Sequence, residues 1–162
     1  MANYHTKAAL EFTLPLEQKI FALQVLECAE DEKVDFTKSR KTLHESAYPS
    51  DVYRLAKRFV KSLDDYEPGN VYLPFNYMDT GDSIHIAHDE SINTEAAATF
   101  CYLILKHFDS DSYVCIEAAH TCSSPRADGF GGHAAFITKK GVKWMSTSHW
   151  MHKNIARHKE AA

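Results

Sequence analysis

Apolar residues recur at helical spacing along several stretches of the chain. The clearest stripe runs from Val52 to Leu63 behind a Pro-Ser-Asp start at residues 49–51, and its three-to-four-residue period predicts an amphipathic helix. A second stretch, residues 93–108, opens with Asn-Thr-Glu and is apolar over more than one stripe. This breadth predicts the central core helix.

The helix predicted first along the chain begins near residue 16 and is expected to end near the acidic residues 30–32. Thr13 is the expected cap, and Pro15 fits the first turn, where a missing N–H costs little. Leu16 and Ile20 begin a broad apolar face that continues through Leu23 and Leu26. We therefore expect this face, including its first turn, to lie against the core.

Alternating apolar and polar residues predict short strands between the helices. The segments are 8–13, 71–78, 83–88, 113–119, 133–138 and 142–146. Turn residues at 79–82 and 139–141 join two pairs of them into hairpins. The pattern predicts one α+β domain over residues 1–162: a mostly antiparallel sheet of five or six strands, with two or three helices packed on one face. From residue 149 the chain is expected to form a short polar helix or tail.

Charge and composition narrow the classes of function. The net charge of −4 argues against direct nucleic-acid binding, which requires a basic face. No apolar run is long enough to cross a membrane, and the first residues lack the basic start and apolar core of a secretory signal. Four scattered cysteines, with Cys28 and Cys101 on apolar helical patterns, favour a reducing cytoplasm. No cofactor is indicated.

Residues 121–132 form an unusually long polar connection between two predicted strands. Long connections with polar side chains are often functional, and we take as candidate binding residues Ser123, Arg126, Asp128 and Phe130. Two interpretations stay open. The connection can cradle an anion, with Arg126 as a bidentate donor. Alternatively it is structural: Arg126 pairs with Asp128, and Gly131 and Gly132 supply a positive φ before the next strand.

The same connection begins with a possible nucleophile. Cys122 follows His120 by two residues, and His133 lies at the far end of the connection. A histidine beside a cysteine favours the reactive thiolate, so Cys122 with His120 is a candidate catalytic pair. Zinc is a related alternative, with candidate ligands His120, Cys122, His149 and His152. These positions do not match the paired short spacings of known zinc motifs.

Aromatic and acidic residues gather around the first predicted hairpin. Tyr72 and Tyr77 lie on its aromatic strand, and Asp79 and Asp82 lie in its turn. Because exposed tyrosines are frequent hot spots of protein interfaces, these four residues are further candidate binding residues.

Two resemblances accompany these motifs. Residues 113–138 contain Thr-Cys-Ser-Ser-Pro-Arg followed by Phe-Gly-Gly, and Trp-Met follows at 144–145. With the Glu-Ser-Ile-Asn-Thr-Glu-Ala-Ala segment at 90–97, they resemble a group of small bacterial and phage-borne proteins without an assigned activity. His133 stands where that group usually has a third glycine. Residues 59–107 are similar to KlcA/ArdB-type antirestriction proteins of plasmids.

These observations predict a non-enzymatic protein-interaction protein. The resemblances imply an accessory or anti-defence role in a phage or mobile element, exerted by docking on a larger protein partner. Its docking surface would combine the 121–132 connection with the aromatic hairpin at 71–86. The alternative is a small cysteine- or zinc-dependent enzyme that uses Cys122 with His120.

Overall fold

The computed structural model of the chain describes residues 3–38, 47–63, 72–124 and 129–160. Its helices and strands follow one another as β1 (Tyr4–Lys7), β2 (Ala9–Thr13), α1 (Leu16–Glu30), α2 (Ser50–Val60), β3 (Asn76–Asp79), β4 (Ser83–Ala87), α3 (Thr94–His107), β5 (Val114–Cys122), β6 (Gly131–Thr138), β7 (Gly141–Ser146) and α4 (Thr147–Glu160).

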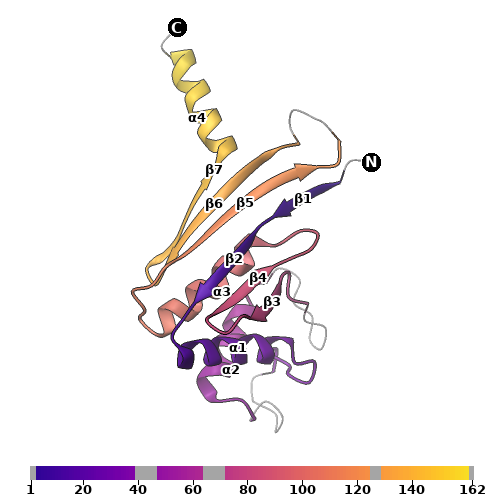
Figure 1. The fold of residues 1–162 in the computed structure, drawn as a ribbon, viewed down its shortest axis with the longest axis vertical. Helices are drawn as coiled ribbons and strands as arrows, with labels where there is room; N and C mark the ends of the chain where they lie inside the picture. The colour runs from indigo at the N-terminus through magenta and orange to yellow at the C-terminus, as the bar shows by residue number, and fades with distance from the viewer. Residues whose placement is uncertain (1–2, 39–46, 64–71, 125–128, 161–162) are drawn as a thin grey trace.

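The strands form two antiparallel sheets (Figure 1). The four-stranded sheet has the order β1-β5-β6-β7, and the three-stranded sheet has the order β2-β4-β3. One run of chain joins them, because β1 and β2 are separated only by Ala8. The α+β class and the antiparallel pairing predicted from the sequence are confirmed. The strands divide between two sheets instead of forming one, since β1 pairs with β5 and β2 pairs with β4.

A single hydrophobic core connects both sheets with α1, α2 and α3. Phe12 of β2, Phe59 of α2 and Phe100 of α3 are fully buried, with ring centroids of Phe100 6.2 Å from Phe12 and 5.6 Å from Phe59. Helix α3 begins where the sequence predicts, because the Asn93 side chain accepts a hydrogen bond from the Ala96 N–H at 3.0 Å. Its extensive burial confirms the central core helix.

Helix α1 departs from its predicted pattern. Pro15, and not Thr13, is its N-cap residue, and no side chain caps it. Leu16 and Ile20 are exposed, whereas Lys19 is buried between them. The ammonium group of Lys19 reaches acceptors on the β3–β4 turn. This charged contact, which hydrophobic periodicity cannot indicate, sets the rotation of the first turn.

Helix α4 is longer than the short polar helix or tail expected from residue 149. It begins directly after β7, runs for 14 residues, and every one of them is exposed. Figure 1 shows it projecting beyond the end of the four-stranded sheet. No helix in the described part of the chain is both long and apolar enough to cross a membrane.

Candidate functional site

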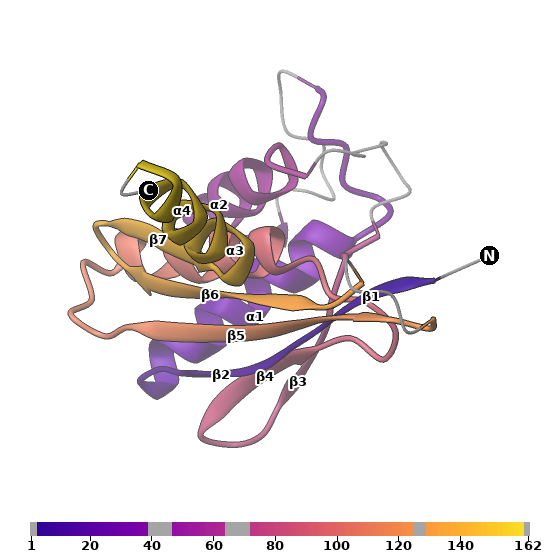
Figure 2. The same ribbon diagram turned by 90° about the horizontal axis from the view of Figure 1, so that it is seen from above.

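The pleat of the four-stranded sheet separates its side chains into two faces. Ala118 of β5 lies opposite His133 of β6, which lies opposite Ser146 of β7. We call the side that carries these residues the inner face. Helices α3 and α4 both contact β6 and β7 and lie on the same side of β6 (Figure 2). The opposite side of the sheet is the outer face.

A chain of polar contacts lies on the inner face at the first turn of α3. The Nδ1 atom of His133 is 2.8 Å from Nε2 of His120, and its Nε2 atom is 2.7 Å from the Thr94 hydroxyl. The Nδ1 atom of His120 lies 3.4 Å from the Thr6 hydroxyl. Both histidines were sequence candidates, and the structure brings them together. The sequence did not indicate Thr94, whose place in the contact depends on how α3 packs on the sheet.

The histidine pair has restricted protonation. A hydrogen bond between two ring nitrogens needs one bare nitrogen, so the two imidazoles cannot both be cations while it persists. Burial and the nearby His120 lower the pKa of His133, and Glu95 opposes them. Thr94 is buried. In its neutral form, the histidine pair therefore links the start of α3 to the sheet.

An open cavity of about 620 Å³ adjoins the pair. Its walls come from α3, β5, β6, β7 and α4: Thr94, Glu95, His120, His133, Trp144, Met145, Ser146 and His149. The Trp144 ring lies 5.6 Å from the His133 ring. Cys122 does not line this cavity. Both nitrogens of His120 face other groups, the Thr6 hydroxyl and the His133 ring.

The residues at the end of β5 join it to the N-terminal segment. Cys122 lies opposite Tyr4 in the β1–β5 ladder. The Ser123 N–H donates to the Asn3 carbonyl at 3.0 Å, and the Asn3 N–H donates to the Ser123 hydroxyl at 2.9 Å. Phe130 is exposed. The predictions for Arg126 and Asp128, including the anion cradle, lie outside the described residues.

Gly131 and Gly132 are needed for space rather than for their φ angles. Positive φ among the described glycines occurs at Gly81 and Gly141, so the expectation for Gly131 and Gly132 was wrong. A Cβ atom on Gly132 would lie 2.8 Å from the Ala118 carbonyl oxygen. The Gly132 N–H donates to the Thr147 hydroxyl at 3.0 Å, which joins β6 to the first residue of α4. The glycines thus allow β6 to lie close to β5 and to the start of α4.

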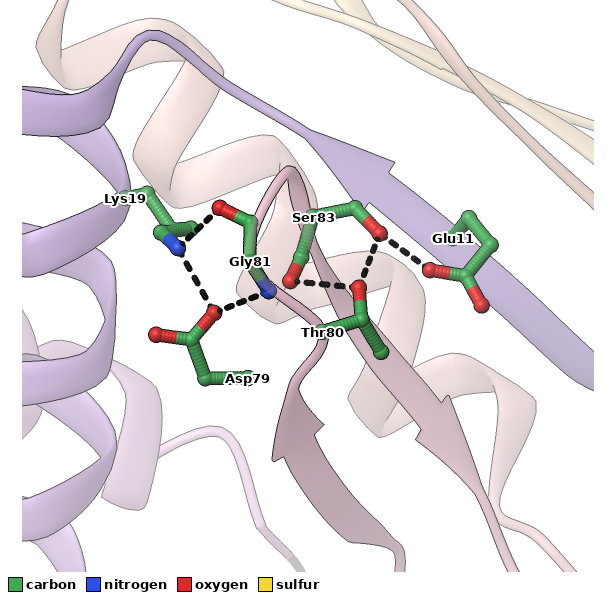
Figure 3. A network of polar contacts seen from close by, with 6 residues as sticks. All are labelled: Glu11, Lys19, Asp79, Thr80, Gly81 and Ser83. Atoms are coloured by element: carbon green, nitrogen blue, oxygen red, sulfur yellow. Dashed lines mark hydrogen bonds and ion pairs between the residues drawn. The ribbon is translucent and has the colours of Figure 1, made fainter.

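A lysine of α1 binds the acidic turn between β3 and β4 (Figure 3). The Lys19 ammonium lies 2.6 Å from both the Asp79 carboxylate and the Gly81 carbonyl oxygen, and the Gly81 N–H donates to Asp79 at 2.9 Å. The Lys19 contact and the Gly81 N–H lower the pKa of Asp79. Asp79 therefore serves to attach the turn to α1, while Asp82 is exposed.

The two tyrosines of the predicted docking surface differ in environment. The Tyr77 hydroxyl donates to Glu30 at 2.9 Å, and burial together with this carboxylate raises the pKa of Tyr77. Tyr72 is 81% exposed. The hairpin turn lies opposite Thr13 and the end of β5 lies opposite Tyr4. Ten residues of extended chain span about 30 Å, so the hairpin turn that holds Asp79 and Asp82 lies far from the end of β5.

The predicted metal ligands are also dispersed. His149 lines the cavity with His120, whereas Cys122 does not, and His152 lies further along the exposed helix α4. Within the described residues, no group of three or more histidine, cysteine, aspartate or glutamate side chains is placed to hold a metal ion. None of the four cysteines forms a disulfide.

The outer face exposes apolar side chains that the sequence analysis did not select. Tyr113, Phe136 and Met145 are 66%, 43% and 58% exposed, and the rings of Tyr113 and Phe136 lie 5.4 Å apart. A groove of about 480 Å³ lies beside them, with Glu117, Ala134, Met145 and Thr147 in its walls. The signal was available: Ala135-Phe136-Ile137 is apolar on both sides of a strand, which is typical of a sheet covered on both faces.

Helix α4 exposes a second set of apolar residues. Trp150, Met151 and Ile155 are 62%, 49% and 52% exposed. Trp150 and Met151 follow Thr147 by three and four residues, so they share its side of the helix. Thr147 itself lines the outer-face groove, and the row of Trp150, Met151 and Ile155 lies further along the helix. We call this row the α4 row.

Comparison with protein-family models, curated proteins and solved structures finds no match to this chain. Function must therefore be argued from the surfaces and contacts described above.

Proposed function

We propose that this protein is a non-enzymatic interaction protein that docks on another protein through its outer face and the α4 row. The observation that carries the proposal is the exposure of Phe136 and Met145 on the outer face and of Trp150 on α4. Exposed apolar patches mark protein interaction sites, and tryptophan is prominent among interface hot spots.

The polar contacts support the same proposal. The Thr94–His133–His120 chain links α3 to the sheet, and Cys122 does not line the cavity beside it. A catalytic cysteine would need a base within hydrogen-bond reach in a concave site. The accessory or anti-defence role in a phage or mobile element rests on the sequence resemblances alone.

An affinity capture experiment tests this function. The tagged full chain serves as bait in a lysate of its source cells, with wild type compared with Phe136→Lys. We expect a stoichiometric protein partner that Phe136→Lys loses, because a lysine would place an unpaired charge in a desolvated interface. Tyr72→Lys is the matched control: Tyr72 is an exposed aromatic outside this surface, and its replacement should retain the partner.

Cys122→Ser separates interaction from catalysis. An interaction protein tolerates this change, because the thiol lies outside the outer face and the α4 row. Capture that is unaffected by Phe136→Lys but lost with Cys122→Ser would overturn the proposal. A partner lost with Tyr72→Lys instead would move the docking surface to the aromatic hairpin.

A further inference from the structure

The cavity beside the histidine pair has the size of a small-molecule site. Its volume of about 620 Å³ lies within the range of about 300–1,000 Å³ that is usual for ligand sites in proteins. Its walls combine an indole ring, three histidines and one carboxylate. Phe136 and Trp150, on which the proposed docking surface depends, do not line it. The cavity is therefore a separate feature of the molecule.

Polar groups in the wall already have partners within the chain. The Thr94 hydroxyl lies 2.7 Å from the His133 ring, and the Ser146 hydroxyl accepts a hydrogen bond from the His149 N–H at 3.2 Å. The Glu95 carboxylate differs. It is exposed and forms no hydrogen bond or ion pair with another described residue, although its charge acts on His133. Glu95 is thus the group that the cavity offers to a ligand.

The charge of the wall is negative at pH 8. Histidine side chains are largely neutral at this pH, so Glu95 is the only charged side chain among the described residues that line the cavity. Lys153 follows His149 by four residues and shares its side of α4. It does not line the cavity, and within the described residues no ion pair joins it to Glu95. Charge therefore favours a cation in the cavity over an anion.

The first turn of α3 does not reverse this preference. A helix N-terminus attracts anions through its free N–H groups and its dipole. Here the Asn93 side chain accepts a hydrogen bond from the Ala96 N–H at 3.0 Å, and Glu95 already places a negative charge in this turn. A metal ion is not favoured either, because no group of three or more ligating side chains is placed to hold one in the described part of the chain.

Two aromatic rings form a corner of the same wall. The Trp144 and His133 ring centroids are 5.6 Å apart, with 56° between the ring planes. Trp144 is 46% exposed, so part of its ring is open to a ligand. The faces of aromatic rings attract cations, tryptophan most strongly, and rings of this kind recognise quaternary ammonium groups. Such a group has no N–H to satisfy, so aromatic surface and one carboxylate suit it.

We propose that this cavity binds a small organic cation with a quaternary ammonium group. The ammonium group lies against the Trp144 ring, the Glu95 carboxylate supplies the opposite charge, and His133 forms the adjacent wall. This site goes beyond the proposed function, and neither proposal depends on the other.

Isothermal titration calorimetry of the full chain at pH 8 tests the site with two probes of the same shape. Choline carries a trimethylammonium group, and 3,3-dimethyl-1-butanol carries an uncharged tert-butyl group in its place. We expect one choline per chain, and a dissociation constant at least about tenfold higher for the alcohol, because only choline is attracted by Glu95 and the ring face. Equal binding of the two probes, or no choline binding at millimolar concentrations, overturns the proposal.

Matched variants test the location of the site. Glu95→Gln keeps the size of the side chain and removes its charge, and Trp144→Leu removes the ring. Each should weaken choline binding at least about tenfold. Glu90→Gln and Trp150→Leu are the controls, because both residues are exposed and neither lines the cavity. They should bind choline as wild type does. If the controls lose as much affinity as the cavity variants, choline binds elsewhere and the proposal is wrong.

Further measurements keep the two proposals apart. Circular dichroism checks that each variant is folded, and Glu95→Gln replaces an exposed side chain, so its result does not depend on repacking of the core. Phe136→Lys should bind choline like wild type, because Phe136 does not line the cavity. If Phe136→Lys loses a captured partner while wild type does not bind choline, the cavity proposal alone fails. Choline binding that Phe136→Lys abolishes would contradict a separate site on the inner face.

Discussion

The solvent-facing sides of the two sheets, here called their outer faces, differ in polarity. In the three-stranded sheet, His85 lies 2.6 Å from the Glu11 carboxylate, and the Ser83 hydroxyl donates to the same carboxylate. In the four-stranded sheet, the equivalent side carries the exposed apolar residues Phe136 and Met145. An antiparallel sheet can present one polar face to water. The first face pairs its charged and polar groups within the chain, whereas the second leaves the Phe136 ring exposed, and this difference is the reason for placing the proposed interaction surface on the second face.

The largest effect should come from placing the same charge on each outer face. Met145 and Met78 are similarly exposed, at 58% and 60%, and lie on the outer faces of the four-stranded and three-stranded sheets. We expect Met145→Lys to weaken binding of the captured partner at least about tenfold, since an interface residue is lost and a charge is desolvated. Met78→Lys should leave this binding unchanged. Titration of the captured partner against each variant measures both.

Equal weakening by the two lysines would contradict the contrast between the faces. Neither variant should change the free energy of unfolding of the monomer by more than about 0.5 kcal/mol, because both sites are exposed. Urea denaturation of the two variants and of wild type checks this.

The close packing of β6 can be broken at one glycine. Gly132→Ala should lower the free energy of unfolding by about 2 kcal/mol, because the new Cβ meets the Ala118 carbonyl oxygen, a backbone atom that cannot move alone. Gly131→Ala should cost less, since its nearest neighbour is the Thr147 side chain at 3.3 Å. Urea denaturation compares the two variants. Equal losses would show that the space around Gly132 is not the reason for the glycine.

The histidine pair should make stability depend on pH. The pKa of His133 lies below its ordinary value of 6.5, so the folded state favours the neutral ring. Stability is therefore full above about pH 6.5 and falls as the pH drops through that value and on through the lowered pKa. His133→Gln should cost about 1 kcal/mol at pH 8, from the altered hydrogen bonds, and should flatten the decline. Thermal melts between pH 5 and pH 8 provide the measurement.

The smallest effect concerns the contact between Lys19 and the β3–β4 turn of the three-stranded sheet. The pKa of Asp79 is lowered by Lys19 and the Gly81 N–H, so its carboxylate stabilises the fold above the ordinary value of 3.8, and this contribution is lost as the pH falls through the lowered pKa. Asp79→Asn should reduce the acid-induced loss of stability. Asp82→Asn, in the same turn but exposed, should not. If Asp79→Asn loses as much stability at low pH as wild type does, the Asp79 carboxylate does not stabilise this turn.

The sequence pattern identified the elements that are stabilised by neighbouring residues or that have a regular apolar period. Helix α2 begins at Ser50 as expected, and the Asn93 cap of α3 was correct, because a cap is formed by neighbouring residues. Strand β1 was missed. Its residues Tyr4–Lys7 show no strong alternation, and they form a strand because β5 supplies their ladder partners from over a hundred residues away.

The candidate residues show the same limit. His120 and His133 were selected as reactive groups, but only the register of β5 and β6 with α3 shows that they contact each other and Thr94. Asp79 was selected as a docking residue because it is acidic and in a turn. Its actual role depends on Lys19, which lies 60 residues earlier in the sequence.

By itself, the sequence determined the α+β class and the positions of most helices and hairpins. Tertiary structure decided which face of each sheet is covered and which polar groups meet. Apolar periodicity reports only that a side chain avoids water, and Phe136 and Trp150 satisfy that pattern as well as Phe100 does. Whether such a side chain is buried within its own chain or left for a partner depends on the layer that packs over it, and α4 leaves the sheet instead of covering it.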